Sequence, residues 1–363
     1  MKYIVCLSDA PWGADPSRAQ QLMARMKEAR VLFFQPASGR GDRRWAKGGV
    51  RVRPNVTVYT LPPVAVEDER LLPLFRIGRR RLARYINRVL DKQRARDYLL
   101  WTTSPEQVHL LDRLGYSALV YDCSGDWSDL PDRWEGSLAH AADVVFAASH
   151  ELLDRLTPCS NNLALLPNGV NYSLFSNHEA PTARLLPDAS GPVFCRTGEI
   201  TADLDLSPVL YAARHRPDWT FVFVGAQDAD NPLLERLSAL DNVVLTGPRP
   251  MVDLPDWMDR GDVLFDLLRE DAAYSDVVAT RIYEYLATGK PVVCMLWPDQ
   301  VEQFPDVIYG AHDQDDFVRL CRTALEEDRT WVAERRRNYA AKAAWSTRAA
   351  DVMHILDTAG LLG

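Results

Sequence analysis

Several patterns that would indicate other classes of protein are missing from this 363-residue chain. The six cysteines are scattered with no C-x-x-C pair, which argues against a zinc site or disulfide framework and predicts buried, reduced thiols. The seven histidines show no metal-like spacing, so we expect no bound metal. The chain has no run of about 18 apolar residues and no signal-peptide pattern at its start. We therefore expect a cytoplasmic protein without a membrane span.

The charge is unevenly distributed. The whole chain has a formal net charge of −8, yet residues 1–96 contain 21 basic and 8 acidic side chains, a net charge of +13. This asymmetry suggests that the N-terminal part faces an anionic partner, although a solvated basic surface is the alternative. Nucleic acid is a poor candidate, because the chain is acidic overall and has no recognisable nucleic-acid-binding module.

Short apolar runs alternate with amphipathic stretches along the chain. Because continuous apolar runs fit parallel strands that are covered on both faces, this alternation predicts an α/β protein with parallel sheets. The series restarts after the polar segment 176–191, which resembles a linker, so we predict two Rossmann-like halves. The predicted strands are 3–8, 31–35, 56–60, 98–101, 118–121, 144–147, 163–166, 193–196, 220–224, 243–246, 263–266 and 291–295. The predicted helices include 16–28, 105–114, 233–240 and 277–287, with further helices from Asp315 onward.

Each half opens with a strand and a turn that contains glycine. Gly13 follows the first strand of the chain, and Gly198 follows the first strand of the second half. Neither turn has the G-x-G-x-x-G pattern, so the dinucleotide-binding fingerprint is absent. A glycine there would let a ligand approach the backbone, and the following helix N-terminus would suit a phosphate. A plain tight turn is the alternative.

The most informative segment is residues 281–293, RIYEYLATGKPVV. It predicts a helix, a glycine stop and a buried strand that begins with proline. Glu284 lies mid-helix among aromatic and aliphatic neighbours, where a buried carboxylate needs hydrogen-bond donors, and a ribose diol would supply two. The alternative is an exposed helix residue without a function. Asp276, eight residues earlier, could cap the helix or accept hydrogen bonds from the hydroxyls of a sugar.

This segment resembles the donor-site helix of GT-B glycosyltransferases in the large retaining group that includes sucrose and glycogen synthases (family 4-like). Further segments resemble the same group in the same order along the chain: 166–170 (LPNGV), 217–225 (PDWTFVFVG), 242–247 (NVVLTG) and the last helix, 345–355. Residues 121–127 (YDCSGDW) are most similar to the bacterial teichuronic-acid and exopolysaccharide enzymes.

The resemblance implies the GT-B fold, with two Rossmann-like domains whose parallel sheets face each other across a cleft and a C-terminal helix that crosses back to the N-domain. It implies an acceptor domain at 1–175, a linker at 176–191, a nucleotide-sugar domain at 192–344 and a returning helix at 345–363. The implied activity is transfer of a sugar from a nucleotide diphosphate sugar to a saccharide or lipid-linked acceptor in bacterial polysaccharide biosynthesis, with retention and without a cofactor. An inverting transferase, an epimerase of the same fold and a non-catalytic scaffold are the alternatives.

The resemblance also implies roles for individual residues. In this group a glutamate at the position of Glu284 holds the ribose, and the acid at the position of Asp276 contacts the transferred sugar. The arginine and lysine that usually follow the first glycine turn of the C-domain are absent after Gly198. Arginine can bind phosphate in a bidentate manner, so other arginines could replace them. The predicted nucleotide-sugar site is completed by Arg196, Arg249, Arg281, Gly225, Gly247 and, in the N-domain, Gly13.

Two aspartates are candidates for the catalytic corner of the N-domain. Many relatives carry a histidine after the fifth strand, whereas here the strand 118–121 runs into Asp122, Cys123 and Asp126. The carboxyl ends of parallel strands are where such folds bind ligands. A retaining transfer needs no strong enzymic base, but an inverting one would, and Asp126 would then be the base. The alternative is that both aspartates are turn and cap residues.

A basic amphipathic segment spans residues 71–96. Arginines surround an apolar stripe with near-helical spacing, made by Leu74, Ile77, Leu82, Tyr85, Ile86 and Val89. Such a helix could dock on an anionic membrane surface. The alternative is that the stripe packs in the core and the arginines are only solvated.

Overall fold

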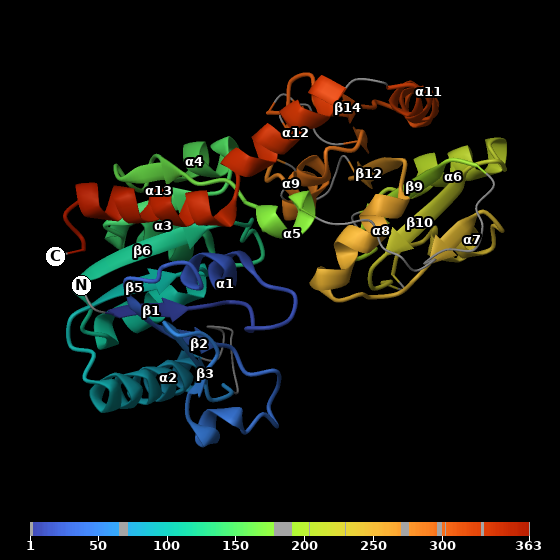
Figure 1. The fold of residues 1–363 in the computed structure, drawn as a ribbon. Helices are drawn as coiled ribbons and strands as arrows, with labels where there is room; N and C mark the ends of the chain where they lie inside the picture. Colours follow the sequence, from blue (N-terminus) through green and yellow to red (C-terminus); the bar gives the residue numbers. More distant parts are fainter. Residues whose placement is uncertain are drawn as a thin grey trace. The chain divides into compact units, whose positions relative to one another are not determined.

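The computed structural model describes residues 3–64, 72–177, 191–202, 204–228, 230–269, 276–295, 300–301, 303–327 and 330–362. Contacts within the chain define two compact units. The first contains residues 1–167 together with 346–363, and the second contains residues 168–345 (Figure 1). Most of the predicted linker, 176–191, lies outside the described residues.

The first unit is built on an eight-stranded sheet with the order β3-β4-β2-β1-β5-β6-β7-β8. All neighbouring strands are parallel except β3, which pairs antiparallel with β4. The sheet therefore has its carboxyl ends, apart from that of β3, along one edge. The strands are β1 (Tyr3–Leu7), β2 (Arg30–Gln35), β3 (Val50–Arg51), β4 (Val56–Thr60), β5 (Tyr98–Thr102), β6 (Ala118–Cys123), β7 (Val144–Ala147) and β8 (Leu163–Leu165).

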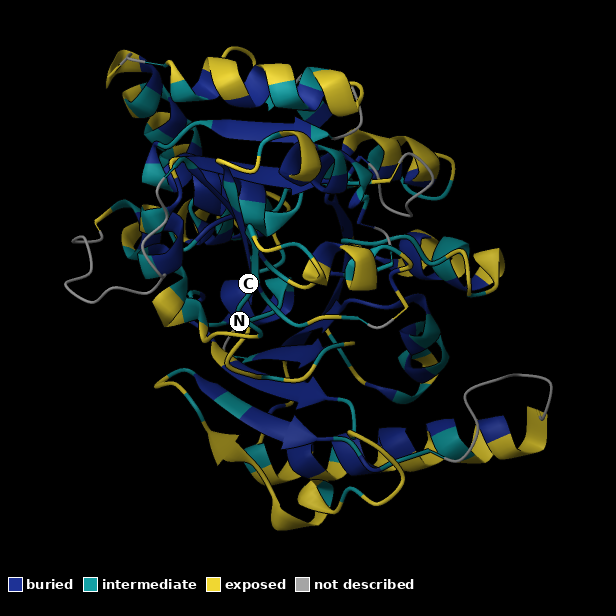
Figure 2. Cartoon of the chain, turned by 90° about the vertical axis from the view of Figure 1, so that its right-hand side faces the viewer, coloured by how far each residue is buried: buried dark blue, intermediate teal, exposed yellow. Residues whose placement is uncertain are grey.

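Helices cover the sheet of the first unit, and most of its strands are buried (Figure 2). The C-terminal helix α13 (Trp345–Thr358) belongs to this unit for nearly its whole length, although it follows the second unit in the sequence. The other helices are α1 (Arg18–Met23), α2 (Leu72–Gln93), α3 (Asp132–Ala141) and α4 (His150–Leu156), with 3-10 helices η1 (Arg44–Lys47) and η3 (Pro105–Arg113).

The second unit contains a six-stranded parallel sheet with the order β11-β10-β9-β12-β13-β14. Its strands are β9 (Val193–Thr197), β10 (Thr220–Val224), β11 (Val243–Leu245), β12 (Val263–Leu267), β13 (Val292–Met295) and β14 (Tyr309–Gly310). Its helices are α5 (Tyr172–Ser176), α6 (Ser207–His215), α7 (Leu234–Ser238), η4 (Met251–Asp253), α8 (Leu254–Arg260), α9 (Thr280–Thr288), α11 (Gln314–Leu325) and α12 (Thr330–Lys342).

Successive residues of these strands serve two different cores. Phe194, Phe221 and Phe265 belong to one buried hydrophobic cluster, while Cys195 and Leu264 belong to the other. Because neighbouring residues of a strand point to opposite faces, a sheet covered on both sides needs continuous apolar runs. The continuous runs in the sequence are explained in this way.

The predicted α/β class and the parallel sheets are confirmed, and every predicted strand is present within a residue or two of its predicted ends. The short strands β3 and β14, of two residues each, were not predicted. Residues 105–113 form a 3-10 helix that begins at the capping box of Ser104 and Gln107. Among the described residues, no helix is long and apolar enough to cross a membrane.

Candidate functional site

The buried carboxylate of Asp266 organises the carboxyl edge of the second sheet. Asp266 lies near the end of β12, which neighbours β9 in the sheet. Its two oxygens accept hydrogen bonds from two arginines, Arg196 Nε at 2.9 Å and Arg281 Nε at 2.7 Å. Burial by itself raises the pKa of the Asp266 carboxyl, but the two guanidinium groups more than reverse this and lower the pKa. Asp266, Arg196 and Arg281 therefore form a charged cluster of one anion and two cations.

The two arginines differ in what they can reach. The Arg196 side chain is 1% exposed, and its Nη1 donates to the carbonyl oxygens of Gly198 and Glu199, at 3.0 Å each. The Arg281 side chain is 29% exposed. Arg196 thus supports the turn after β9 from inside, whereas Arg281 presents a positive charge that a ligand can approach.

Only glycine fits at position 198, because of the backbone conformation there and because Arg281 lies so close. The φ angle of Gly198 is +103°, which side-chain-bearing residues rarely adopt, and a Cβ atom there would lie 2.7 Å from Arg281 Nη1. Gly225, just after β10, is constrained by a close contact alone, because its Cβ would lie 2.1 Å from the carbonyl oxygen of Gly198. The two glycines let the strand ends and Arg281 come together at one point.

Helix α9 holds Arg281 and Glu284 one turn apart beside this edge. Its Tyr285 is fully buried, and the hydroxyl accepts a hydrogen bond from the backbone N–H of Thr197 at 2.9 Å. The helix ends at Gly289, which has a φ of +81° and adopts the left-handed conformation. This anchoring fixes the helix against the end of β9.

The structure places both predicted sugar- and ribose-binding acids in buried positions. Glu284 is 6% exposed, and its negative charge acts on Arg281. Asp276 is 9% exposed and lies a few residues before α9, whose N-cap is Ala279. Asp276 is therefore not the N-cap residue that one interpretation of the sequence proposed.

Arg249 and Gly247 lie in the turn after β11. Gly247 has a φ of +74°, and the guanidinium of Arg249 stacks 5.4 Å from the ring centroid of Trp257 and donates to the carbonyl oxygen of Thr246 at 3.3 Å. None of the described contacts of Arg249 joins it to the Asp266 cluster. The structure thus brings Arg196, Gly198, Gly225 and Arg281 together, but not Arg249.

In the first unit, Asp122 is engaged by an arginine that the sequence analysis did not single out. Asp122, on β6, is 1% exposed, and Arg18 Nε donates to its carboxylate at 2.9 Å. Arg18 Nη2 also donates to the carbonyl oxygen of Leu166 at 2.7 Å. Burial raises the pKa of the Asp122 carboxyl, and Arg18 opposes this rise.

Asp9 provides a second carboxyl group at the same edge, just after β1, and the residue is exposed. Its carboxylate accepts a hydrogen bond from the Thr103 hydroxyl at 2.7 Å, and partial desolvation by the surrounding protein raises its pKa. The charge of Asp9 adds to the raised pKa of Asp122. Burial raises the pKa of the nearby Cys6 thiol, and the charges of Asp122 and Asp9 raise it further. No motif in the sequence marks Asp9, because it comes together with Thr103 only in the sheet.

Asp126 belongs to a separate cluster around Arg155. Arg155 Nη1 donates to Asp126 at 3.1 Å, and its Nη2 donates to Glu135 at 3.0 Å. Glu135 also accepts a hydrogen bond from the Tyr121 hydroxyl at 2.9 Å. Arg155 thus joins Asp126 and Glu135 in one cluster of charged side chains.

Gly13 lies in a loop that glutamine side chains hold in place. The Gln20 side chain exchanges two hydrogen bonds with the Gly13 backbone, each 2.9 Å long. A Cβ at Gly13 would meet nothing closer than 3.9 Å, and its φ is not in the left-handed region. Nothing in the described surroundings therefore requires glycine here.

The stripe predicted on residues 71–96 divides between the core and the surface. Leu82, Tyr85, Ile86 and Val89 of α2 are buried, as the core interpretation expects. Leu74 and Ile77 are 50% and 59% exposed. Arg79 is buried, pairs with Glu106 at 3.0 Å and stacks on Phe75, so it is a packing residue. The outer arginines of α2 are exposed, namely Arg76, Arg80, Arg81, Arg84 and Arg88.

Comparison with known proteins gives consistent results. Residues 206–354 match the family described as glycosyl transferase-like. Over 382 aligned positions, covering 94% of each chain, the protein is 28% identical to a teichuronic acid biosynthesis glycosyltransferase, TuaH, of Bacillus subtilis.

Solved structures share the fold. Sucrose-phosphate synthase from Thermosynechococcus elongatus superposes with a TM-score of 0.77 at 16% identity, over 100% of both chains. HepE from Anabaena, in complex with UDP and glucose, superposes with a TM-score of 0.69 at 16% identity, over 99% of this chain and 100% of that one.

Proposed function

We propose that this chain is a GT-B glycosyltransferase that transfers a sugar from a nucleotide diphosphate sugar to a saccharide or lipid-linked acceptor in bacterial polysaccharide biosynthesis. The relationship to TuaH supports the polysaccharide context, and the UDP bound by HepE supports a nucleotide donor. The donor would bind to the second unit and the acceptor to the first. The observation that carries the proposal is the accessible Arg281, held by Asp266 against Gly198 and one helical turn from Glu284.

The chemistry of this edge suits a nucleotide diphosphate. Arg281 would take the place of the missing arginine and lysine pair and neutralise the diphosphate as it leaves. Arg196 would act as a positioning residue, since its guanidinium is buried beneath the turn. Glu284 would accept hydrogen bonds from the ribose hydroxyls, and Asp276 would accept them from the donor sugar. The resulting D-x7-E arrangement supports retention of the anomeric configuration.

Asp9 favours an inverting transfer as the second candidate. An inverting reaction needs a base near the acceptor hydroxyl, and Asp9 is an exposed carboxyl group with a raised pKa at the carboxyl edge of the first sheet. Analysis of the anomeric configuration of the product separates the two candidates.

Glu284→Ala tests the donor site. A panel of nucleotide sugars is first screened by thermal shift, since a ligand that binds the native state raises its apparent stability. For the nucleotide found in this way, we expect Glu284→Ala to weaken binding by about 1–3 kcal/mol, because two ribose hydroxyls lose their acceptor. Isothermal titration calorimetry measures the change in Kd.

Glu334→Ala, which removes an exposed glutamate of α12, is the matched control and should leave the Kd unchanged. Unchanged affinity in a folded Glu284→Ala protein would remove the ribose role. If no nucleotide sugar shifts the melting temperature or is hydrolysed, the scaffold alternative would replace the enzyme.

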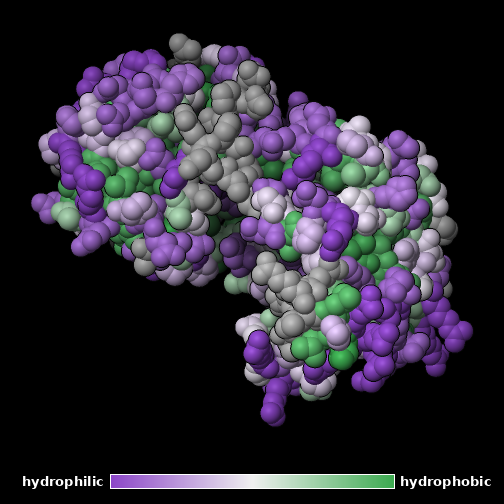
Figure 3. All heavy atoms as spheres, turned by 180° about the vertical axis from the view of Figure 1, so that it is seen from behind, coloured by the Kyte–Doolittle hydropathy of each residue, from purple (hydrophilic) through white to green (hydrophobic). Residues whose placement is uncertain are grey.

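The outer face of α2 supports peripheral docking at the inner face of the membrane. Two exposed aliphatic side chains, Leu74 and Ile77, lie near the start of the helix, followed by exposed arginines. Hydrophilic side chains cover most of the molecular face in Figure 3, with smaller hydrophobic areas between them. Exposed apolar residues flanked by arginine are the composition that binds anionic lipid.

Replacing Arg80, Arg84 and Arg88 by Gln should weaken binding to phosphatidylglycerol vesicles about 100-fold. Each basic side chain near an anionic surface contributes about 1 kcal/mol. The measurement is vesicle sedimentation, and higher salt should weaken binding of the parent protein in the same way. The matched control replaces Arg214, Arg236 and Arg322, which are exposed in the second unit. A parent protein that stays in the supernatant at low salt would exclude docking.

A further inference from the structure

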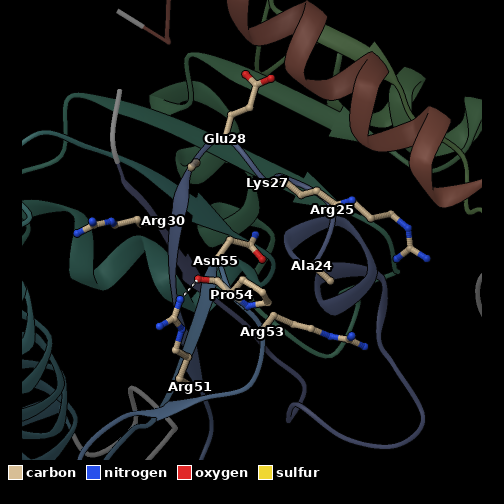
Figure 4. Close-up of a pocket in the computed structure, with 10 residues that line it drawn as sticks. Ala24, Arg25, Lys27, Glu28, Arg30, Arg51, Arg53, Pro54 and Asn55 are labelled. Carbon is tan, nitrogen blue, oxygen red and sulfur yellow. Dashed lines mark hydrogen bonds between the residues drawn. The ribbon is translucent and has the colours of Figure 1, made fainter.

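A basic pocket of about 720 Å³ lies at the amino-terminal edge of the first sheet (Figure 4). It is formed by the residues between α1 and β2 and by the turn that connects β3 to β4. These segments precede the parallel strands β2 and β4, whereas Asp9 and Asp122 lie at the carboxyl ends of β1 and β6. The pocket is therefore at the opposite edge of the sheet from the candidate catalytic carboxylates.

The lining of this pocket is strongly cationic. It contains one acidic side chain, Glu28, and five basic side chains: Arg25, Lys27, Arg30, Arg51 and Arg53. In Figure 4, Arg25 and Arg53 extend on one side of Pro54, while Arg30 extends on the other side. A ligand seated over Pro54 would thus meet positive charge on both sides.

These cations have no carboxylate partner within the described part of the chain. Arg25 Nη1 donates to the backbone and side-chain oxygens of Gln21, and Arg51 Nη2 donates to the carbonyl oxygen of Pro54 at 2.6 Å. The side chains of Lys27 and Arg53 form no hydrogen bond with a described residue. Elsewhere in this unit, arginines such as Arg18 and Arg155 are neutralised by aspartate or glutamate. The positive charges of the pocket are therefore available to an anionic ligand.

The pocket also has a fixed frame. Asn55 Nδ2 donates to the carbonyl oxygens of Met23 and Met26, at 3.1 Å each, and so ties the turn before β4 to the end of α1. Burial lowers the pKa of Arg25, and the neighbouring charge of Arg53 lowers it further. The frame therefore holds like charges near each other, which costs free energy until an anion binds between them.

We propose that this pocket binds a ligand with two or more phosphate groups. Arginine forks match the oxygens of phosphate in bidentate geometry, and a ligand with several phosphates can reach the cations on both sides of Pro54. The phosphates belong either to a free phosphorylated molecule or to lipid headgroups. The site is separate from the proposed donor site around Arg281, which lies in the other unit.

Hydrogen–deuterium exchange of the full chain with inorganic pyrophosphate tests the proposal and locates the binding. We expect pyrophosphate at low ionic strength to slow exchange in peptides that cover residues 24–30 and 51–55. The double substitution Arg25→Gln with Arg53→Gln should weaken this protection at least about tenfold in pyrophosphate concentration, since charge-assisted hydrogen bonds are lost. Protection at the donor site would appear in different peptides, around residues 196–200 and 281, so the two sites are distinguished.

The control Arg214→Gln with Arg322→Gln removes the same charge from the second unit and should keep the protection. Lys27→Gln is a second pocket variant, because its side chain has no described contact to lose. Absence of protection at 24–30 and 51–55, or equal protection in the double variant, would overturn the proposal and leave a solvated basic surface.

Vesicle sedimentation then assigns the source of the phosphate. If phosphatidylglycerol vesicles bind the parent protein, and both pyrophosphate and the pocket substitutions reduce that binding, the ligand is a lipid headgroup. If the pocket substitutions abolish pyrophosphate protection but leave vesicle binding unchanged, the ligand is a free phosphorylated molecule. Both results support a phosphate site.

Discussion

Asp266→Ala is expected to destabilise the second unit by about 3–5 kcal/mol, the usual cost of removing one partner from a buried ion pair. The substitution would leave Arg196, which is 1% exposed, and Arg281 without their shared carboxylate. Urea unfolding monitored by tryptophan fluorescence measures the change, with hydrogen exchange assigning it to the second unit.

The same cluster predicts a pH dependence. The folded-state pKa of Asp266 is lowered, so it lies below the unfolded value of about 3.9. The contribution of this group to stability is therefore present above that pH and is lost as the pH falls through the folded-state pKa. The Asp266→Ala protein should lack this contribution to the free energy of unfolding already at neutral pH.

Asp218→Ala is the matched control, because Asp218 forms an ion pair with Arg216 on the surface. It should change stability little, since exposed ion pairs are screened by water. Equal stability changes for the two substitutions would mean that the Asp266 cluster is not structurally important.

Arg281→Gln is expected to reduce the rate of sugar transfer by about 10²–10³-fold, the effect of removing one group that stabilises developing negative charge. The reason is that the departing diphosphate would lose its accessible cation, while Asp266 keeps its bond to Arg196. The substitution should also weaken binding of the nucleotide diphosphate more than binding of its nucleoside. Steady-state kinetics and calorimetry with both ligands measure these effects.

Arg249→Gln serves as the comparison for Arg281. Arg249 is exposed and stacks on Trp257, outside the Asp266 cluster. We expect it to have the smaller effect on the diphosphate. An equal loss of nucleoside and diphosphate binding in Arg281→Gln would identify Arg281 as a structural residue only.

Much of the fold could be predicted from the sequence, because local patterns carry the information. The alternation of apolar runs and amphipathic stretches indicated parallel sheets, and the observed strands match those runs. The short strands β3 and β14 were missed because two residues show no periodicity. On α2, the apolar spacing correctly indicated a helix, but it could not separate the buried Ile86 from the exposed Ile77. That division depends on which part of the helix the sheet covers.

The candidate site was only partly visible in the sequence. The segment around Glu284 pointed to a donor helix, and Arg196 and Arg281 were selected as possible phosphate-binding residues. Arg196 is buried and Arg281 is partly exposed, and both are held by Asp266. In the sequence, Asp266 is only the last residue of a predicted strand, so nothing there indicates this role. Asp9 was missed for the same reason, since its partner Thr103 is 94 residues away in sequence.

The sequence by itself determined the α/β class, the order of strands along the chain and the segment that resembles a donor helix, because each of these is a property of neighbouring residues. Only the tertiary structure decided which charges are neutralised inside the protein and which are left for ligands. Arg196, Arg18 and Arg155 are matched by carboxylates from distant segments, whereas the basic residues around Pro54 have no such partner among the residues that the structure describes. Pairing of charges depends on distances of a few ångströms between strands, and the linear order of residues does not contain those distances.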